Sequence, residues 1–453
     1  MMKYQCYAEY KDSGVEWLGE IPSHWDSKPL KYLCTYNDEV LTEATSSDTE
    51  IQYIDIGSVS ATEGISHIET MLFKDAPSRA RRIVKDGDVI VSTVRTYLEA
   101  IAPIDNPPEN LIVSTGFAVI RPNKNLYKGY AAYCLRAKGF IKEVVARSVG
   151  VSYPAINSSD LVNIAVPSIA YSEQTKIANF LDHETAKIDS LIEKQQQLIQ
   201  LLKEKRQAVI SHTVTKGLNP NVPMKDSGVE WLGKVPEHWE LVPLKYLCTF
   251  SGGGTPSKDN LNYWTDGDIP WVSPKDMKTF WIKETQDYIT EKAIKESSTN
   301  MVEPNSLLMV VRSGILQRTI PIAINKVPVT MNQDMKALKF GNRVLVEYIA
   351  DLIHGNTSEL LLEWSKEGAT VESIEHEYLA NSIVPVPPIE EQQSITTLVA
   401  KKMGVYRELT CKAESQIFLL QERRTALISA AVTGKIDVRN WQNPTEAKME
   451  FSA

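Results

Sequence analysis

The side chains best suited to binding chemistry lie in short polar segments that follow strand-like apolar runs. They are rich in arginine, asparagine, glutamine, serine and threonine. In chain order the segments are 92–97 (STVRTY), 150–153 (GVSY), 255–258 (TPSK), 271–275 (WVSPK), 311–313 (VRS) and 331–334 (MNQD). Arginine and carboxamide side chains make paired hydrogen bonds with the edges of nucleic-acid bases, and hydroxyls are permissive partners. The segments are therefore candidates for base recognition.

Two arginines in these segments share a distinctive position. Arg95 follows the run GDVIVSTV and Arg312 follows the run NSLLMVV, so each guanidinium is predicted at the exit of a strand. Together with the basic residues at 79–82, the segments supply the candidate DNA-binding residues. These are Arg79, Arg81, Arg82, Arg95, Tyr97, Ser152, Tyr153, Thr255, Ser257, Lys258, Ser273, Lys275, Arg312, Ser313, Asn332 and Gln333.

Charge is distributed unevenly along the chain. The whole sequence holds 49 Lys and Arg against 57 Asp and Glu, a net charge of −8 that by itself disfavours an anionic partner. Residues 121–147, however, hold seven basic residues against one acidic residue, and residues 305–343 hold six against one. Basic stripes of this kind focus an electrostatic field on phosphates. A solvated face with ion pairs is the alternative for any single run.

Catalytic signatures are few and incomplete. Residues 106–109 (NPPE) resemble the Asn-Pro-Pro-aromatic loop of adenine methyltransferases, but Glu109 takes the place of the aromatic residue that stacks on a flipped base. The sequence has no glycine-rich S-adenosylmethionine loop, no GxxxxGKS/T phosphate loop and no HExxH zinc motif. A surface turn is the preferred interpretation of residues 106–109. We therefore predict no catalytic residue, metal site or cofactor site in this chain.

The regions that must position the polar segments occur as an internal sequence repeat. Lys11–Tyr36 and Lys225–Phe250 share 19 of 26 residues at an offset of 214. The similarity returns near the end of each half at an offset of 218, where the pair Glu173-Gln174 matches Glu391-Gln392. Between these regions the two halves share almost no sequence. Each half thus consists of a shared head, a private middle and a shared tail.

Both tails are predicted to be long helices. Residues 172–214 contain no Gly or Pro and are rich in Gln, Lys, Glu, Leu and Ile. Apolar residues recur at heptad spacing; in the first tail these are Leu181, Ile188, Leu191, Leu198, Leu202 and Val209, and in the second they include Leu409 and Leu420. A one-sided helix of about 60 Å is not stable alone. We therefore expect the two tails to pair with each other.

The heads and middles complete an α+β architecture. Trp17 and Trp25 lie eight residues apart around a proline turn, so we predict that they anchor the first head on its own core, with a docking face for another protein as the alternative. His24 and its repeat mate His238 are predicted to be structural. Strands are predicted at 51–56, 88–94, 112–121 and 306–311, and helices at 130–145 and 344–362.

Composition places the chain among ordinary globular proteins. With 43% hydrophobic and 23% charged residues, it belongs to neither the disordered nor the fibrous class. A chain of 453 residues is too long to fold around a single hydrophobic core, so more than one domain is expected. The best apolar run, Leu111–Ile120, is about half the length that spans a bilayer, and five scattered cysteines predict no disulfide framework. We therefore expect a cytoplasmic protein with no membrane partner.

The sequence resembles the specificity subunits of type I restriction–modification enzymes. The resemblance rests on DSGVEWLGEIPSHW at 12–25, GVSYPAINSSDLVNIAVPS at 150–168, SGGGTPSKDNLNYWTDGDIPWVSPKDM at 251–277 and PPIEEQQSI at 387–395. It covers almost the whole chain, and the motifs are specific in combination. One departure is SIAYSEQ at 168–174, where the family usually has a proline-rich segment; we expect this to alter only a turn.

The resemblance implies an α+β fold with two globular target recognition domains. Two long antiparallel helices would join them as a coiled-coil spacer, with an internal pseudo-two-fold. The implied regions are a head and first recognition domain in 1–165, a central helical region in 166–224, a second head and recognition domain in 225–385, and a distal helical region with the C-terminal tail in 386–453. Each recognition domain would read one half of a bipartite sequence in double-stranded DNA.

The resemblance also implies partners. Two methyltransferase (modification) subunits would dock on the chain, and restriction subunits with ATPase and nuclease activity would join the complex. S-adenosylmethionine, ATP and Mg²⁺ would belong to those partners, and the chain itself would be non-catalytic. Two other hypotheses remain open at this stage. One is a self-contained DNA adenine methyltransferase with Asn106 in its active site, and the other is a coiled-coil adaptor without DNA contact.

Overall fold

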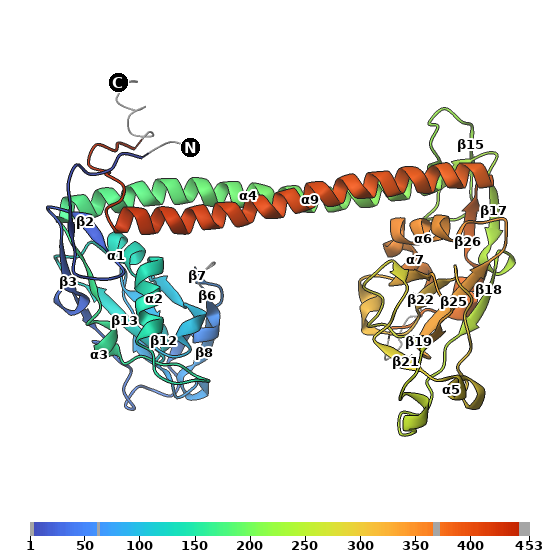
Figure 1. The fold of residues 1–453 in the computed structure, drawn as a ribbon. Helices are drawn as coiled ribbons and strands as arrows, with labels where there is room; N and C mark the ends of the chain where they lie inside the picture. Colours follow the sequence, from blue (N-terminus) through green and yellow to red (C-terminus); the bar gives the residue numbers. More distant parts are fainter. Residues whose placement is uncertain (1–3, 61–63, 366–371, 444–453) are drawn as a thin grey trace. The chain divides into compact units, whose positions relative to one another are not determined.

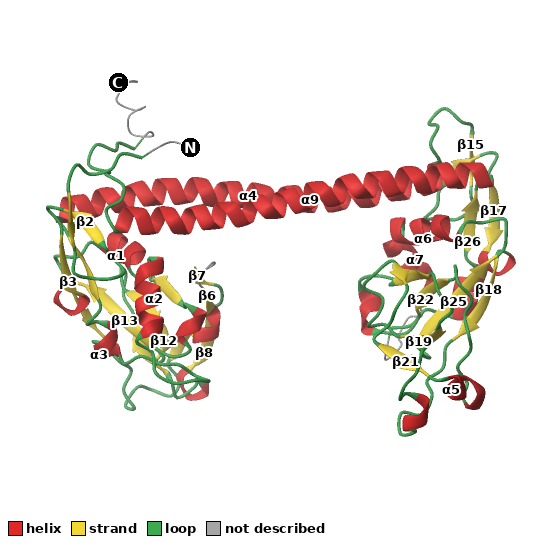
Figure 2. Cartoon of the chain, in the orientation of Figure 1, coloured by secondary structure: helices red, strands yellow, loops and turns green. Residues whose placement is uncertain are grey.

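The computed structural model describes residues 4–60, 64–365 and 372–443 (Figure 1). These residues divide into two compact units. Unit 1 contains the described residues up to Gln195 and those from Ser415 onward, and unit 2 contains Gln196–Glu414. Both units mix helices and strands (Figure 2), which confirms the α+β class. Among the described helices, none is both long enough and apolar enough to cross a bilayer.

Two four-stranded sheets form the middle of unit 1. Their strand orders are β11-β10-β13-β4 and β8-β5-β12-β9, with β5 and β12 parallel. The bounds are β4 (Cys34–Tyr36), β5 (Glu50–Ile54), β8 (Glu69–Leu72), β9 (Ala80–Ile83), β10 (Val89–Ser92), β11 (Ile101–Pro103), β12 (Leu111–Ser114) and β13 (Phe117–Pro122), with the small ribbon β6 (Val59–Ser60) and β7 (Gly64–Ile65) alongside. Every residue of β10 and β12 is buried, because both faces of the strands are covered.

The head of unit 1 is a set of short paired strands, and helices pack beside it. The head strands are β1 (Tyr10–Asp12), β2 (Glu20–Pro22) and β3 (Asp26–Pro29), and β3 pairs with β14 (Ala165–Ser168) just before the long helix. The helices are α1 (Lys128–Cys134), α2 (Lys138–Ala146), α3 (Ser158–Leu161) and the first part of α4 (Tyr171–Lys216).

Unit 2 has a similar plan, with sheets of five and three strands in place of two sheets of four. Its sheets have the orders β18-β25-β22-β23-β20 and β21-β19-β24, and its head strand β17 pairs with β26. The strands are β15 (Met224–Asp226), β16 (Lys234–Pro236), β17 (Glu240–Pro243), β18 (Cys248–Gly252), β19 (Ile269–Val272), β20 (Trp281–Ile282), β21 (Asp287–Ile289), β22 (Leu307–Val310), β23 (Ile322–Asn325), β24 (Thr330–Met331), β25 (Met335–Phe340) and β26 (Ile383–Val386). The helices are α5 (Glu291–Glu296), α6 (Val346–Gly355), α7 (Thr357–Trp364), α8 (His376–Asn381), the second part of α4, and α9 (Ile389–Val432) up to Glu414; the rest of α9 belongs to unit 1.

Helices α4 and α9 run antiparallel within each unit. In unit 1, Arg424 of α9 approaches Asp189 of α4 with 3.1 Å between Nε and Oδ1. In unit 2, Arg206 Nε of α4 lies 3.1 Å from Met403 Sδ of α9. Position increases along α4 as it decreases along α9, so the predicted pairing of the two tails is confirmed.

A glutamate at the start of each long helix anchors the head, and it is buried in unit 1 and partly buried in unit 2. The Glu173 carboxylate accepts hydrogen bonds from Tyr7 Oη at 2.7 Å and Trp25 Nε1 at 3.2 Å, and His24 lies 3.1 Å away. Glu391 holds Trp239 Nε1 at 3.1 Å and His238 at 2.9 Å in the same way. Trp25 and Trp239 are fully buried, and the partly buried Trp17 donates from Nε1 to the Ala165 carbonyl at 2.9 Å, so the head packs on its own core.

The next residue, a glutamine, fastens the private middle to the same helix end. Gln174 Oε1 accepts the Tyr127 N–H at 2.7 Å, and its Nε2 donates to the carbonyls of Asn125 and Ile169 at 2.9 and 3.0 Å. Gln392 makes the equivalent three bonds, to Leu345 N–H and to the carbonyls of Arg343 and Pro387. Because each carboxamide is buried and uses both of its ends, it fixes the middle in one orientation.

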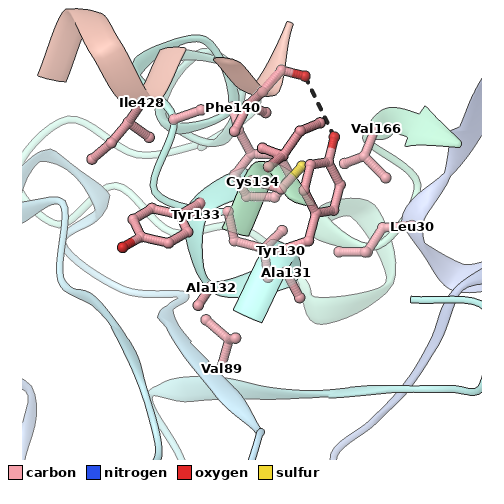
Figure 3. Close-up of a cluster of buried hydrophobic side chains, with 14 of the residues drawn as sticks. Leu30, Val89, Tyr130, Ala131, Ala132, Tyr133, Cys134, Phe140, Val166 and Ile428 are labelled. Carbon is pink, nitrogen blue, oxygen red and sulfur yellow. Dashed lines mark hydrogen bonds between the residues drawn. The ribbon is translucent and has the colours of Figure 1, made fainter. Parts of the chain in front are cut away.

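Each unit also packs on the far end of the opposite long helix. The Tyr130 hydroxyl in the core of unit 1 donates to the Val432 carbonyl of α9 at 3.4 Å, and Ile428 joins the same apolar cluster (Figure 3). In unit 2, the Tyr348 hydroxyl donates to the Val214 carbonyl of α4 at 2.9 Å. Both pairs are related by the offset of 218, so the duplication extends to tertiary packing.

Several predicted elements differ from the observed ones. The helices expected at 130–145 and 344–362 are each divided in two, and the strand expected at 112–121 is divided at Thr115. Asn356 ends α6 because its carboxamide bonds to the Leu352 carbonyl at 2.8 Å in place of a helical continuation. The heptad prediction was wrong for Leu191, Leu198 and Leu409, which are exposed, because a pair of helices shields only one side of each.

Replacing the anchoring glutamate tests the head attachment. We expect Glu173→Ala to lower the free energy of unfolding by about 1–3 kcal/mol, because it leaves the buried Trp25 N–H and Tyr7 hydroxyl without an acceptor. Urea denaturation followed by tryptophan fluorescence measures this. Lys194→Ala on the exposed side of α4 is the control and should change stability by less than about 0.5 kcal/mol. Equal stability of the two variants would contradict the anchor.

Candidate nucleic-acid interface

Backbone hydrogen bonds bring three segments of unit 1 to one edge of its sheets. The Thr93 N–H, just after β10, donates to the Gly116 carbonyl at 2.8 Å. The Thr115 N–H donates to the Arg79 carbonyl at 2.8 Å. The exposed Arg79 side chain therefore lies at the same edge as the exit of β10.

The two candidate segments of unit 1 form one surface. Val94 pairs with Ala155 in a β-bridge, and the Arg95 guanidinium lies over the Tyr153 ring with its carbon 5.1 Å from the ring centroid. Arg95 has a φ of 52°, a left-handed conformation that costs energy for a residue with a side chain. Tyr97 and Tyr153 are 55% and 66% exposed, and Ser152 is exposed beside them. A guanidinium pre-oriented on a ring is a suitable donor for a base edge or a phosphate.

Arg81 and Arg82 lie within β9 instead of in an exposed loop. The Arg81 guanidinium stacks over Phe73 with 4.7 Å from its carbon to the ring centroid. Arg82 is half-buried, its Nε and Nη1 have no hydrogen-bond partner, and desolvation lowers its pKa. These two arginines are therefore partly buried strand residues, whereas Arg95 and Tyr153 are exposed.

Four candidate segments of unit 2 meet at the ends of its strands. The Gly254 N–H donates to the Met331 carbonyl at 2.8 Å, and the Asn332 N–H donates to the Val272 carbonyl at 2.9 Å. The Val311 N–H donates to the Asp334 carbonyl at 2.8 Å. The loops after β18, β19, β22 and β24 consequently form one continuous surface.

The candidates of unit 2 divide into exposed and supporting side chains. Thr255 Oγ1 donates to Gln333 Oε1, and Gln333 itself is exposed. The other exposed members are Ser257, Lys258, Lys275 and Arg312. Ser273 and Asn332 are buried and bond to Asp276 and Asp334. Ser313 caps the short helix Gly314–Gln317 through the Ile315 N–H. The buried Ser273 and Asn332 side chains shape the loops, and the exposed side chains are available to a ligand.

Arg95 and Arg312 both follow strand-like runs in the sequence, but they do not occupy equivalent positions in the two repeats. The β-bridges Val94–Ala155 and Arg312–Ser373 are related by the offset of 218. Arg312 is therefore equivalent to Val94, and Ser313 to Arg95. The same offset relates Tyr97 to Ile315, and both are exposed. The exposed Ile315 and Val149 lie outside the candidate segments, because those were chosen for their polar groups; the repeat offset locates Ile315.

The structure places Asn106 away from a catalytic setting. Asn106 is exposed in a turn after β11, has a φ of 46°, and its N–H donates to Asp86 Oδ1 at 3.0 Å. A base-flipping enzyme needs an enclosed pocket at this position. In the described ranges, no group of three or more His, Cys, Asp or Glu side chains has the spacing of a metal site.

Residues 22–201 and 236–401 match the protein family described as type I restriction modification DNA specificity domain. The type I restriction enzyme EcoR124I/EcoR124II specificity subunit of Escherichia coli is 39% identical over 201 residues, 44% of this chain and 47% of that protein, so the matched part spans about half of that relative. The MjaVIII specificity subunit of Methanocaldococcus jannaschii is 22% identical over 340 residues, 73% of this chain and 76% of that protein.

Two solved structures share the fold. One comes from a study titled as the structural basis of complex assembly and conformational transition of the type I R-M system; it has a TM-score of 0.68 and 22% identity, and covers 92% of this chain and 99% of its own. The other is the HsdS subunit from Thermoanaerobacter tengcongensis, with a TM-score of 0.52 and 22% identity over 92% of this chain and 98% of its own.

Adjacent glycines offer a matched test of the unit 2 surface. A Cβ at Gly253 would lie 1.9 Å from the Asn332 carbonyl oxygen, whereas a Cβ at Gly252 meets nothing within 4 Å. We expect Gly253→Ala to destabilise unit 2 by at least about 1–3 kcal/mol, because the backbone of residues 331–333 must move. Gly252→Ala should be close to neutral. Thermal unfolding of both variants measures the difference, and equal midpoints would refute the close packing of these loops.

Proposed function

Because the chain belongs to the family of type I restriction modification DNA specificity domains, we propose that it reads a bipartite target in double-stranded DNA. The private middle of each unit contacts one half-site. The chain performs no catalysis and supplies the sequence preference of a larger complex. Specificity of this kind requires a protein surface whose side chains differ between the two half-sites.

The observation that carries the proposal is the gathering of polar loops at the strand ends of each unit. Unit 1 presents Arg95, Tyr97 and Tyr153 at this position, and unit 2 presents Arg312 and Gln333. The frames are equivalent, but the exposed groups are not. Two different half-sites follow from one repeated architecture.

Base-edge contacts and phosphate contacts have separate roles in this proposal. Arg95 and Arg312 read guanine through paired hydrogen bonds, and Gln333 reads adenine. Lys258 and Lys275 are exposed and suited to phosphates, which position the protein without reading sequence. The net charge of −8 predicts weak, strongly salt-dependent binding by the chain alone.

The long helices provide surfaces for partner subunits. Helix α4 exposes Leu191, Leu198 and Leu201, and α9 exposes Val405, Leu409, Phe418 and Leu419. Exposed apolar residues in such number on charged helices mark protein contacts. We assign them to two methyltransferase subunits, through which restriction subunits join. S-adenosylmethionine, ATP and Mg²⁺ then bind to those partners and not to this chain.

The helices also act as the spacer between half-sites in this proposal. Helix α4 is continuous for 46 residues and α9 for 44, and residues of each helix belong to both units. A continuous helix rises about 1.5 Å per residue, so its length is a direct geometric constraint on the gap between the sequences read.

Two alternative functions receive less support. A self-contained DNA adenine methyltransferase would use Asn106, yet this residue lies in an exposed turn. A coiled-coil adaptor without DNA contact leaves the repeated polar strand ends without a role. Assay of the chain alone for DNA methylation separates the enzyme from the specificity subunit, since only the enzyme transfers methyl groups without partners.

Single arginine substitutions test the assignment of readers. We expect Arg95→Ala to weaken binding to the preferred duplex by about 1–3 kcal/mol and to relax one position of one half-site, because it removes a base-specific pair of hydrogen bonds. Arg312→Ala should relax the other half-site. Selection from randomised duplexes, followed by sequencing, measures both preferences.

The control for Arg95 is Arg147→Ala in the same unit. Arg147 is exposed and pairs with Glu143 at 3.1 Å, so its removal subtracts a positive charge from a side chain that the proposal does not assign to a base. A uniform reduction of affinity across all sequences for Arg95→Ala would assign Arg95 to a phosphate and contradict its role as a reader.

A further inference from the structure

A basic pocket of about 330 Å³ lies in unit 2 beside the second part of α4. Lys203 and Arg206 of α4 line one side, and Arg318, after the short helix Gly314–Gln317, lines another. The junction of α6 and α7 forms a further wall, where Gln207 Nε2 donates to the carbonyls of His354 and Gly355 at 2.7 and 2.8 Å.

The positive charge of this pocket is not balanced by the protein. Within the part of the chain that the structure describes, no carboxylate lies within 4.0 Å of the charged groups of Lys203, Arg206 or Arg318. Burial, with the nearby Arg206, lowers the pKa of His354 to about 4, so the imidazole stays neutral at physiological pH. Three uncompensated cations beside one cavity repel each other, and an anion in the cavity would relieve that repulsion.

At the equivalent position in unit 1, an acidic residue neutralises the positive charge. In unit 1 the equivalent of Arg206 is Arg424, which pairs with Asp189 at 3.1 Å. The offset of 218 places Arg407 of unit 2 at the position of Asp189, so the carboxylate is replaced by a fourth basic residue. Lys203 likewise has the uncharged Gln421 as its equivalent. The excess charge is therefore a private feature of unit 2 and not a requirement of the shared frame.

We propose that this pocket binds a phosphate group. Three separate cations and the hydroxyls of Thr319 and Ser358 line the cavity, which suits an anion with several acceptor oxygens better than a single carboxylate. The phosphate comes either from a DNA backbone or from a free phosphate, and both present the same chemistry. The DNA source rests on the proposed function, because it adds a sequence-independent contact to the bases read at the strand ends.

The experiment compares the full-length chain with the triple variant Lys203→Gln, Arg206→Gln, Arg318→Gln. Fluorescence anisotropy with labelled duplexes over a range of salt gives the slope of log affinity against log salt, which changes by about 0.9 for each phosphate that the protein no longer neutralises. We expect the slope to become shallower by about 1, with the ratio of target to non-target affinity unchanged. Lys194→Gln, an exposed lysine elsewhere on α4, is the control for removal of a single charge and should leave the slope unchanged.

Calorimetric titration with inorganic phosphate forms the second arm. A shallower salt slope identifies the DNA backbone as the source, and loss of inorganic phosphate binding with an unaltered slope identifies a free phosphate. If the triple variant changes neither readout, the pocket does not bind phosphate and the proposal is overturned. Absence of any sequence preference in the wild-type chain would refute the proposed function, whereas the phosphate titration would still decide the pocket.

Discussion

The hydrogen bonds of one buried glutamine in each repeat hold the private middle on the long helix. Gln174 and Gln392 each use both ends of the carboxamide to bind three backbone groups, two from the middle and one from the turn before the helix. Beside them, Glu173 and Glu391 fix the heads through tryptophan N–H groups. Since these contacts involve backbone atoms and shared residues, the remainder of the middle is free to differ without a change in its orientation.

This arrangement separates the frame from the surface that we propose reads DNA. The frame consists of the heads, the glutamate–glutamine pairs and the tyrosines that bond to the opposite helix, Tyr130 and Tyr348. The reading surface consists of loops at strand ends, where an exposed arginine in one unit is equivalent to a serine in the other. The basic pocket of unit 2 follows the same rule, since Arg407 replaces the acid that neutralises the equivalent place in unit 1.

The sequence predicted the features that repeat and missed those that depend on distant contacts. The repeat predicted the two long helices and matched Glu173-Gln174 with Glu391-Gln392, but only the structure shows that these residues anchor the heads and the middles. The burial of Ser273 and Asn332, and the stacking of Arg81 on Phe73, depend on partners far along the chain that no local pattern specifies. The exposure of Leu191 and Leu198 was not predicted, because a heptad pattern does not specify how many helices pack together.

The central claim is that the two repeats of this chain specify the two half-sites of a single DNA target. Single-molecule methylome sequencing of host cells with and without the gene tests this most directly. The account predicts that one bipartite motif with a fixed gap loses its methylation when the gene is removed, with both halves affected together. A methylome that is unchanged, or the disappearance of methylation from a single uninterrupted motif, would contradict it.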